Sequence, residues 1–351
     1  MVKNMKQPLV SIIILNYNGI EFIENCLDSV IDSKYLNKEI IIVDSTSSDG
    51  SSELVKKKYG KLKNLKIIEI PRSFGTDRGR NTGVAKARGE YLMFLDNDTE
   101  VDPNWLNELI KVMQSDKSIG SAQSKLLKIE PRDRFDCAGD YLGPLGFLVG
   151  RSQEAKDIGQ FDFITDIFSA KSAASIIRSK IFRKIGRFDE DYFKYLEETD
   201  LSWRVWLAGY RVVFIPKSIV YHAFNTARKD FKRYYQKNIF RYYGCRNYIS
   251  TLIKNLEFTN LIKILPIHLG CWLTLSMFFF LKGSFDNGLY ILKGVSWNFF
   301  NLGLLLKKRR LINTKIRKVN DCEIFNKIMV KRPAKFYLEI GLNCLTGKFE
   351  R

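Results

Sequence analysis

Residues 88–98 read RGEYLMFLDND, and the apolar run Tyr91–Leu95 within them predicts a buried β-strand that ends at Asp96. Asp96 and Asp98 flank a single residue, and ionised carboxylates at that spacing repel each other unless a cation lies between them. Mg²⁺ or Mn²⁺ takes oxygen ligands, commonly one or two carboxylates together with phosphate oxygens. The triplet alone is a weak signal, because Asp, Asn and Thr often end strands and cap helices.

Strand-like and helix-like segments alternate around this run through the first hundred residues. Val10–Leu15 is a continuous apolar, β-branched run of the kind found in a parallel strand that is covered on both faces. Further strands are expected at Glu39–Val43 and Leu65–Ile70, and helices at Glu21–Ile31, Ser51–Tyr59 and Asn81–Ala87. This alternation predicts an α/β fold with a mainly parallel sheet flanked by helices.

Polar clusters follow three of the expected strands at the point where each strand ends. They are Asn16-Tyr17-Asn18, Asp44-Ser45 and Asp96-Asn97-Asp98. Ligands of parallel α/β sheets bind beyond the carboxyl ends of the strands, so we expect these clusters to line one site.

The segment from Pro103 to His222 has a mixed pattern and is expected to complete the sheet. Helices are expected at Trp105–Met113 and Glu198–Leu207. Strands are expected at Ile119–Leu127, Phe168–Ile177, Arg211–Ile215 and Ser218–His222, the last two separated by Pro216.

Charge is distributed unevenly along the 351 residues. The chain has 57 Lys+Arg and 38 Asp+Glu, a net charge of +19. From Ala223 onward there are 24 basic and 7 acidic residues, so this part carries +17 and the preceding part only +2. We therefore predict a balanced domain over residues 1–225 and a basic helical region over residues 226–351.

The basic region also contains the two longest apolar stretches. Ile264–Leu281 has no Asp, Glu, Lys or Arg, and Gly288–Leu306 is interrupted by one charged residue, Lys293. These stretches fit a hairpin that crosses a bilayer with both ends in the cytosol, two helices that lie in the membrane interface, or two buried helices of a soluble domain. Pro266 and His268 weaken the spanning interpretation. We expect contact with an anionic membrane surface, at the cytoplasmic face of the cell membrane.

The six cysteines are scattered and form no C-x-x-C pair, so neither a zinc site nor a disulfide framework is indicated. A reducing cytosol fits this usage. The apolar run near the N-terminus is short and is followed at once by polar residues, so no cleavable signal is expected.

Four segments together resemble the signatures of family 2 glycosyltransferases, in the family order. They are VSIIILNYNG (10–19), IVDSTSSDGS (42–51), GRNTG (79–83) and RGEYLMFLDND (88–98). The resemblance extends from about Leu9 to His222 and looks closest to rhamnosyltransferase-like members that act in surface polysaccharide assembly. It implies a GT-A fold and inverting transfer of a sugar from a nucleoside-diphosphate donor with a divalent metal, Mg or Mn.

The resemblance also implies roles for the residues at the strand ends. Asp44 would hold the base or ribose, and Tyr17 would contact the base with its ring. Asp96 would face the ribose or the metal, Asp98 would ligate the metal, and Arg80 could neutralise phosphate charge. The structural alternatives are an Asx-type turn with a packed ring for Asp44 and Tyr17, and a surface charge for Arg80.

A second acidic cluster lies in YLEETDLSWR (195–204). By the resemblance, Glu198 would be the general base that deprotonates the acceptor hydroxyl, with Glu197 as the neighbouring candidate. Many relatives have Asp at this position, so Glu198 is a departure. A helix start with acidic residues near its positive dipole end, and an Asp200–Arg204 ion pair, would explain much of the same pattern.

His222 ends an expected strand 24 residues after Glu198. Metal-dependent family members place a metal-ligating His at about this distance, although a lone His at a strand end is usually structural. For His268, inside an apolar stretch, we expect a packing or interfacial role. Asp136–Gly143 resembles a glycine-bearing segment near the acceptor, and a turn-rich loop is the alternative.

Two rival interpretations differ in chemistry. A nucleotidyltransferase would have a basic, glycine-rich phosphate loop after the first strand, and Asn16–Gly19 has no Lys or Arg. A catalytically silent module that binds sugar or nucleic acid at a membrane could use the basic, aromatic stretch Arg228–Arg246. We expect a saccharide or lipid-linked saccharide as acceptor, and no nucleic-acid partner.

Overall fold

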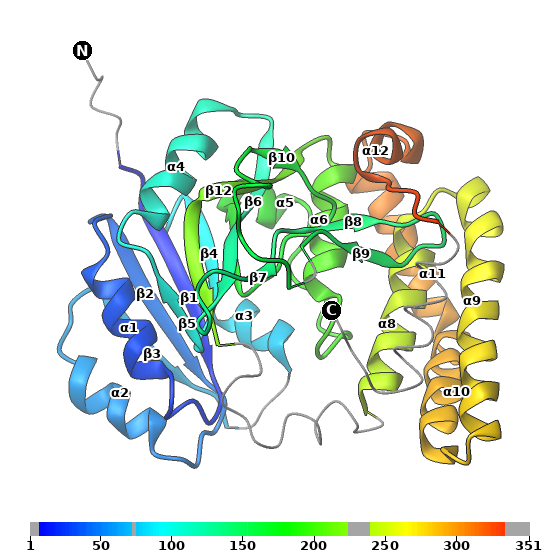
Figure 1. The fold of residues 1–351 in the computed structure, drawn as a ribbon, viewed down its shortest axis with the longest axis horizontal. Coiled ribbons are helices and arrows are strands. Elements are labelled where there is room, and N and C mark those ends of the chain that lie inside the picture. The colour runs from blue at the N-terminus through cyan, green and yellow to red at the C-terminus, as the bar shows by residue number, and fades with distance from the viewer. Residues whose placement is uncertain (1–6, 72–74, 153, 224–238, 334–351) are drawn as a thin grey trace.

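The computed structural model describes residues 7–71, 75–152, 154–223 and 239–333, and a sheet of ten strands forms its centre (Figure 1). Four strands make the N-terminal half: β1 (Val10–Asn16), β2 (Lys38–Asp44), β3 (Leu65–Glu69) and β4 (Tyr91–Asp96). They lie in the order β3-β2-β1-β4 and pair in parallel, as predicted. In the β1–β2 register Asn16 lies opposite Asp44, which brings the polar strand ends to one edge.

Helices cover both faces of this half, which explains the continuous apolar strands. Ile12 and Ile14 of β1 pack in the cluster that includes α1 (Ile23–Asp32), α2 (Ser51–Tyr59) and α4 (Trp105–Ser115). Ile13 points to the opposite face, which α3 (Thr76–Ala85) covers. Successive side chains of a strand alternate between the faces, so a strand that is buried on both sides is apolar throughout.

Helix α3 begins five residues earlier than the predicted Asn81–Ala87. Its first turns contain polar residues and Gly79, a composition that hides a helical pattern. The glycines serve packing, because a Cβ atom at Gly83 would lie 2.6 Å from Ile13 Cγ2. Helix α3 can therefore lie close against the strands that end at the candidate site.

The second half makes the sheet mixed. Strand β11 (Ala174–Arg178) runs antiparallel to both β4 and β6 (Ile119–Lys128), and β12 (Arg211–His222) runs parallel to β6. The remaining short strands of this sheet are β5 (Thr99–Val101), β7 (Phe135–Cys137) and β10 (Thr165–Asp166). A separate hairpin consists of β8 (Asp140–Leu142) and β9 (Leu148–Gly150), and helices α5 (Ser179–Lys184) and α6 (Glu197–Leu207) complete this half.

Two predicted boundaries in this half differ from the structure. The expected strand Phe168–Ile177 begins only at Ala174, because Ser169 pairs with Asp140 of β8 and a turn closed by the bond from Ala174 N–H to the Lys171 carbonyl precedes the strand. The two strands expected on either side of Pro216 are one strand, β12, with a register irregularity between Ile215 and Ile219. Proline has no N–H for the ladder, so it interrupts the pairing without ending the strand.

The basic region is helical where it is described: α8 (Ile239–Asn255), α9 (Phe258–Leu281), α10 (Phe285–Phe300), α11 (Leu302–Leu311) and α12 (Asp321–Ile328). Its first part, residues 224–238, lies outside the described residues. Leu252 of α8 and Ile324 of α12 belong to the same buried cluster as Leu201 of α6. Lys254 of α8 also forms ion pairs with Asp189 and Asp200, at 2.6 and 2.9 Å. These helices therefore pack tightly against the sheet-containing half.

Candidate active site

The ends of the parallel strands are joined by amide and carboxylate side chains. Asn16 Nδ2 donates to Asp44 Oδ2 at 2.7 Å, and Asn97 Nδ2 donates to Asn16 Oδ1 at 2.8 Å. Asn16 therefore connects the ends of β2 and β4, and all three predicted clusters meet at one edge of the sheet.

Asp44 and Tyr17 occupy different environments at this edge. Asp44 is buried and accepts from the backbone N–H of Ser47 at 2.9 Å, the Asx-type turn that the sequence allowed. Tyr17 has 55% of its surface exposed. The edge thus offers an exposed aromatic ring beside a loop that is hydrogen-bonded to the buried carboxyl group of Asp44.

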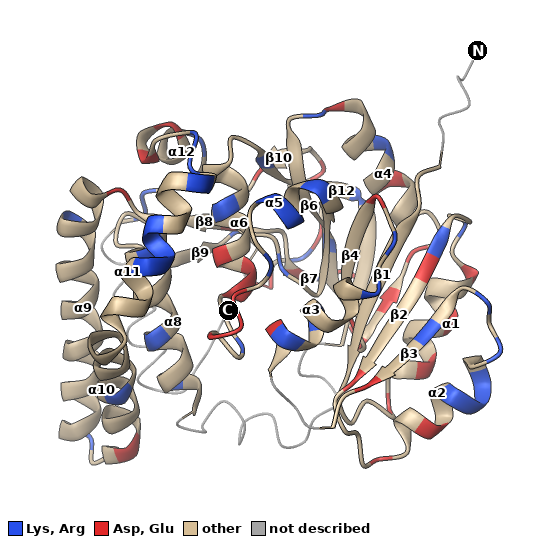
Figure 2. Ribbon diagram, turned by 180° about the vertical axis from the view of Figure 1, so that it is seen from behind, with Lys and Arg blue, Asp and Glu red and all other residues tan. Residues whose placement is uncertain are grey.

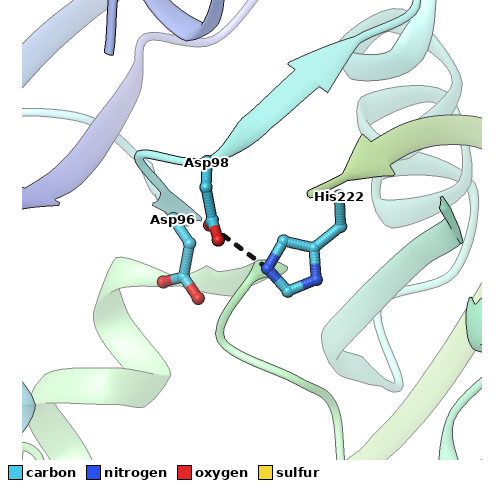
Figure 3. Close-up of side chains that lie close together, drawn as sticks. All are labelled: Asp96, Asp98 and His222. Carbon is cyan, nitrogen blue, oxygen red and sulfur yellow. Dashed lines mark ion pairs between the residues drawn. The ribbon is translucent and has the colours of Figure 1, made fainter. Parts of the chain in front are cut away.

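Asp96, Asp98 and His222 come together beside it (Figure 3). One potential ligand atom from each lies within 4.8 Å of the others, and His222 Nε2 is 3.2 Å from Asp98 Oδ1. Pairing between β5 and β12 causes this approach: β5 follows Asp98 directly, and His222 lies opposite Thr99 in the antiparallel register. The sheet thereby joins residues more than a hundred positions apart in the sequence.

Asp136 orients the imidazole of His222. Its Oδ2 lies 2.9 Å from His222 Nδ1, which leaves Nε2 directed at Asp98. A carboxylate on the second ring nitrogen is typical of metal-binding histidines. Asp136 was considered at the sequence level only as part of a segment near the acceptor, because no spacing rule relates it to His222.

Electrostatics also suit a cation at this position. Burial raises the pKa of Asp96, an effect that Arg80 opposes and Asp98 reinforces. Burial lowers the pKa of His222, but Asp98 and Asp136 outweigh it and hold that pKa well above its usual value. Two mutually repelling carboxylates and an imidazole are a donor set that fits a divalent ion such as Mn²⁺ or Mg²⁺.

Arg80 lies between this group and the second acidic cluster. Its Nη1 is 2.7 Å from Glu197 Oε1, and its Nη2 is 3.1 Å from Asp96 Oδ1. Glu197 also accepts from Thr76 Oγ1 at 2.9 Å. Arg80 is 5% exposed, so it is not a surface charge, and both of its close partners are carboxylates of the site.

Glu197 and Glu198 therefore differ sharply, although both begin α6. Glu197 is held by Arg80 and buried, whereas Glu198 has a side chain that is 16% exposed and lies 3.8 Å from Lys171 Nζ. Burial and the charge of Glu197 raise the pKa of Glu198 to about 8, and Lys171 opposes this rise. A carboxylate whose pKa lies near neutrality is suited to accept and return a proton.

Two further residues of the site were not singled out from the sequence. Lys171 pairs with Asp140 Oδ2 at 2.7 Å and faces Glu198, and Asp77 is fully buried beside Glu197. Burial and Glu197 raise the pKa of Asp77 to about 8, with Arg80 opposing. Neither residue belongs to a spaced motif, so only the folded chain brings them to the acidic pair.

Comparison with known proteins places this geometry in a family. Residues 11–183 match the model of "Glycosyl transferase family 2". The poly-beta-1,6-N-acetyl-D-glucosamine synthase of Staphylococcus epidermidis is 24% identical over 226 residues, covering 62% of this chain and 51% of the synthase. The chain spans about half or less of the length of the curated relatives that it matches.

Solved structures share the fold. S. aureus TarS 1–349 in complex with UDP-GlcNAc superposes with a TM-score of 0.55 at 17% identity, over 87% of this chain and 86% of that one. Mannosyltransferase PcManGT from Pyrobaculum calidifontis, in complex with GDP-Man and Mn²⁺, gives 0.53 at 15% identity, over 88% and 86%. With its four signature segments, its mixed sheet and the matched family model, residues 11–183 form a domain of glycosyl transferase family 2, and the chain has the GT-A fold.

Proposed function

We propose that this chain transfers a glycosyl group, with inversion, from a nucleoside-diphosphate sugar to an acceptor hydroxyl. One observation carries the proposal: Arg80 links a three-residue candidate metal-binding group to an acidic pair whose less buried member, Glu198, has a raised pKa. Inverting transfer needs both parts, a cation at the leaving diphosphate and a base near the attacking hydroxyl.

Asp98 and His222 would hold the divalent ion, with Asp96 beside them. A bound ion would supply charge stabilisation for the departing diphosphate. Asp136 keeps the imidazole turned toward Asp98, and Arg80 balances the charge of Asp96 and so keeps that carboxylate in place. Arg80 would therefore act through its carboxylate partners rather than as a free phosphate ligand.

The nucleoside would bind at the edge formed by β1 and β2. Tyr17 presents an exposed ring for stacking on the base. Asp44 would accept hydrogen bonds from the base or ribose at the rim of its turn. The nucleotide-sugar complexes of TarS and PcManGT, with UDP-GlcNAc and GDP-Man, support this class of donor.

Glu198 would take the proton of the acceptor hydroxyl. Glu197 is already bonded to Arg80 and Thr76, so its role would be to position α6. Lys171 keeps the carboxylate of Glu198 oriented and limits the rise of its pKa.

The acceptor would be a saccharide or lipid-linked saccharide in cell-surface glycan assembly. The relatives named for poly-β-1,6-N-acetyl-D-glucosamine and O-antigen biosynthesis support this class. The basic C-terminal helices would hold the protein against an anionic membrane surface at the cytoplasmic face, where such acceptors lie.

A donor screen with UDP- and GDP-sugars, with and without Mn²⁺, tests the proposal. Glu198→Gln should lower turnover by about 10²–10⁴-fold and leave Mn²⁺-dependent donor binding intact. Asp98→Asn should instead weaken that binding, measured by calorimetry. Glu53→Gln, an exposed carboxylate on α2, is the matched control. Full turnover by Glu198→Gln would remove the proposed base.

A further inference from the structure

The outward surface of the C-terminal helices is apolar, the reverse of a helix on the surface of a soluble protein. On α9 the exposed apolar residues recur every four to six positions: Phe258, Ile262, Ile267, Leu273, Met277 and Leu281. On α10, Phe299 and Phe300 are 75% and 81% exposed. Figure 2 shows the α9 ribbon almost without charged residues, whereas α11 carries a basic cluster.

Length and composition leave open how this surface meets a bilayer. Helix α9 has 24 residues and a mean hydropathy of 1.8 over an 18-residue window, sufficient to cross a membrane. Helix α10 passes the same test only together with residues 302–316, as a pair bent by 62°. A crossing helix, however, must place its whole circumference in hydrocarbon or against other membrane-embedded protein.

The inner side of α9 is attached to the catalytic half. His268, near the middle of α9, is fully buried, and its Nδ1 lies 2.8 Å from the carbonyl oxygen of Leu145 in the β8–β9 turn. Phe147 of the same turn stacks on the imidazole at 4.0 Å between ring centroids. If α9 crossed the bilayer, this turn and its backbone polar groups would lie at mid-membrane depth.

The inner side of α10 is attached to the active site through α8. Asn298 Nδ2 donates to the carbonyl oxygen of Arg246 at 3.0 Å, and Ser250 Oγ donates to Asn298 Oδ1 at 2.7 Å. Asn247, the next residue of α8, donates to the carbonyl oxygen of Tyr195 at 2.9 Å, just before the acidic pair. The C-terminal end of α10, near the middle of the α10–α11 pair, is thus one helix away from the loop before the acidic pair, and carboxylates that act on a charged donor cannot lie in hydrocarbon.

Basic residues border the apolar surface. Lys263, Lys282, Lys293, Lys307 and Arg310 are exposed on α9, α10, α11 and the connection between α9 and α10, against one exposed acid there, Asp286. Apolar area next to basic side chains is the composition of helices that lie in an anionic membrane interface.

We infer that α9, α10 and α11 lie in the plane of the membrane interface, with their outward face at the boundary between headgroups and acyl chains, and that neither α9 nor the α10–α11 pair crosses the bilayer. This inference rests on the membrane contact in the proposed function and is independent of sugar transfer. It places the catalytic edge beside the lipid surface, where a lipid-linked acceptor would present its hydroxyl.

Cys271 offers a natural reporter of depth. It is exposed on α9, whereas Cys26, Cys137 and Cys245 are buried. The full chain with Cys322→Ser and Cys344→Ser would carry an environment-sensitive fluorophore on Cys271. The labelled protein would be bound to phosphatidylcholine vesicles containing phosphatidylserine, with nitroxide quenchers either near the top of the acyl chain or near its end.

The expected result is stronger quenching by the shallow nitroxide, since an interfacial helix sits about 5–10 Å below the headgroups. Stronger quenching by the deep nitroxide would overturn the inference, because the middle of a spanning helix lies about 15 Å deep. The control label is placed on α2, on the opposite side of the molecule, as Lys57→Cys in a Cys271→Ser background, and should be quenched by neither (Figure 1).

A second pair of variants tests the surface without a label. Leu273→Glu combined with Met277→Glu should weaken vesicle binding at least about tenfold. Leu36→Glu, at an 80% exposed leucine between β1 and β2, should not. If the unmodified chain bound vesicles but did not turn over a donor, only the proposed sugar transfer would be contradicted. No vesicle binding by the unmodified chain would overturn this inference and the membrane contact on which it rests, and would leave the proposed sugar transfer untouched.

Discussion

Replacing Glu198 with Gln should stabilise the folded protein at neutral pH while it removes activity. Burial and the charge of Glu197 raise the pKa of Glu198 from 4.5 to about 8. Between these values the folded state holds a proton that the unfolded chain has released. A group with a raised pKa in the folded state therefore costs stability as pH rises, from the unfolded pKa up to the folded one.

The magnitude follows from the two pKa values. The linkage relation predicts that the free energy of unfolding falls by about 3 kcal/mol between pH 4 and pH 7, and by about 5 kcal/mol once Glu198 is fully ionised. The stability lost by pH 7 depends little on the pKa in the folded state, because the loss begins at the unfolded pKa of 4.5 and is counted only up to pH 7. Gln has no proton to lose, so its stability advantage should grow by about 3 kcal/mol over this range.

Urea unfolding followed by tryptophan fluorescence, with EDTA present and at a series of pH values between 4 and 8, measures this advantage. Glu53→Gln, exposed on α2, is the control for the chemistry of the substitution. A stability difference between Glu198→Gln and the native protein that stays constant with pH would refute the assignment of a buried, proton-holding carboxyl at this position.

Three other predictions concern neighbouring contacts. Lys171→Met should raise the pKa of Glu198 further, because the charge of Lys171 lowers that pKa in the native protein. The acidic limb of the pH profile of kcat/KM should therefore move to higher pH, and an unmoved limb would contradict this. Arg80→Met should lower the free energy of unfolding in urea by about 3–5 kcal/mol, because it leaves Asp96 and Glu197 without their buried partner. A decrease below about 1 kcal/mol would show that the pairing does not stabilise the fold. In thermal unfolding, Gly75→Ala should lower the Tm more than Gly50→Ala does. Both glycines have positive φ, at 88° and 86°, but only at Gly75 would an added Cβ atom meet backbone, 2.2 Å away. Equal decreases in Tm would be inconsistent with that clash.

Local patterns predicted much of the fold. The strands Val10–Leu15 and Tyr91–Leu95 are apolar on both faces because helices cover both faces, and such runs can be recognised without knowing their partners. The carboxyl ends of parallel strands necessarily meet at one edge, so the polar clusters at Asn16, Asp44 and Asp96 could be placed together from the sequence. Boundaries were less predictable where glycines and polar residues form a helix, as in α3.

The sequence suggested a cation at Asp96 and Asp98 from the spacing of the two carboxylates, but included His222 only through the family resemblance. Nothing local relates His222 to Asp98, and the pairing of β5 with β12 brings them together. Strand β6 pairs with both β7 and β12, which brings Asp136, on β7, to the other ring nitrogen, a contact that no spacing could show.

The arrangement around the acidic pair was decided by tertiary structure. In the sequence Glu197 and Glu198 are adjacent and have identical side chains, so nothing local distinguishes their roles. In the folded chain Glu197 forms an ion pair with Arg80, whereas Glu198 lies near Lys171, so the two carboxylates have different environments. Burial and neighbouring charge control a pKa, and both depend on chain segments that are distant in sequence.

The sequence by itself therefore determined the strands, the polar edge, the acidic residues and the presence of apolar helices, because these depend on residue type and short-range periodicity. Only the tertiary structure decided which carboxylate pairs with Arg80, which partner orients His222, and which side of α9 is covered by the β8–β9 turn. Those properties arise from contacts between segments that the chain's own folding brings together, and no local pattern encodes them.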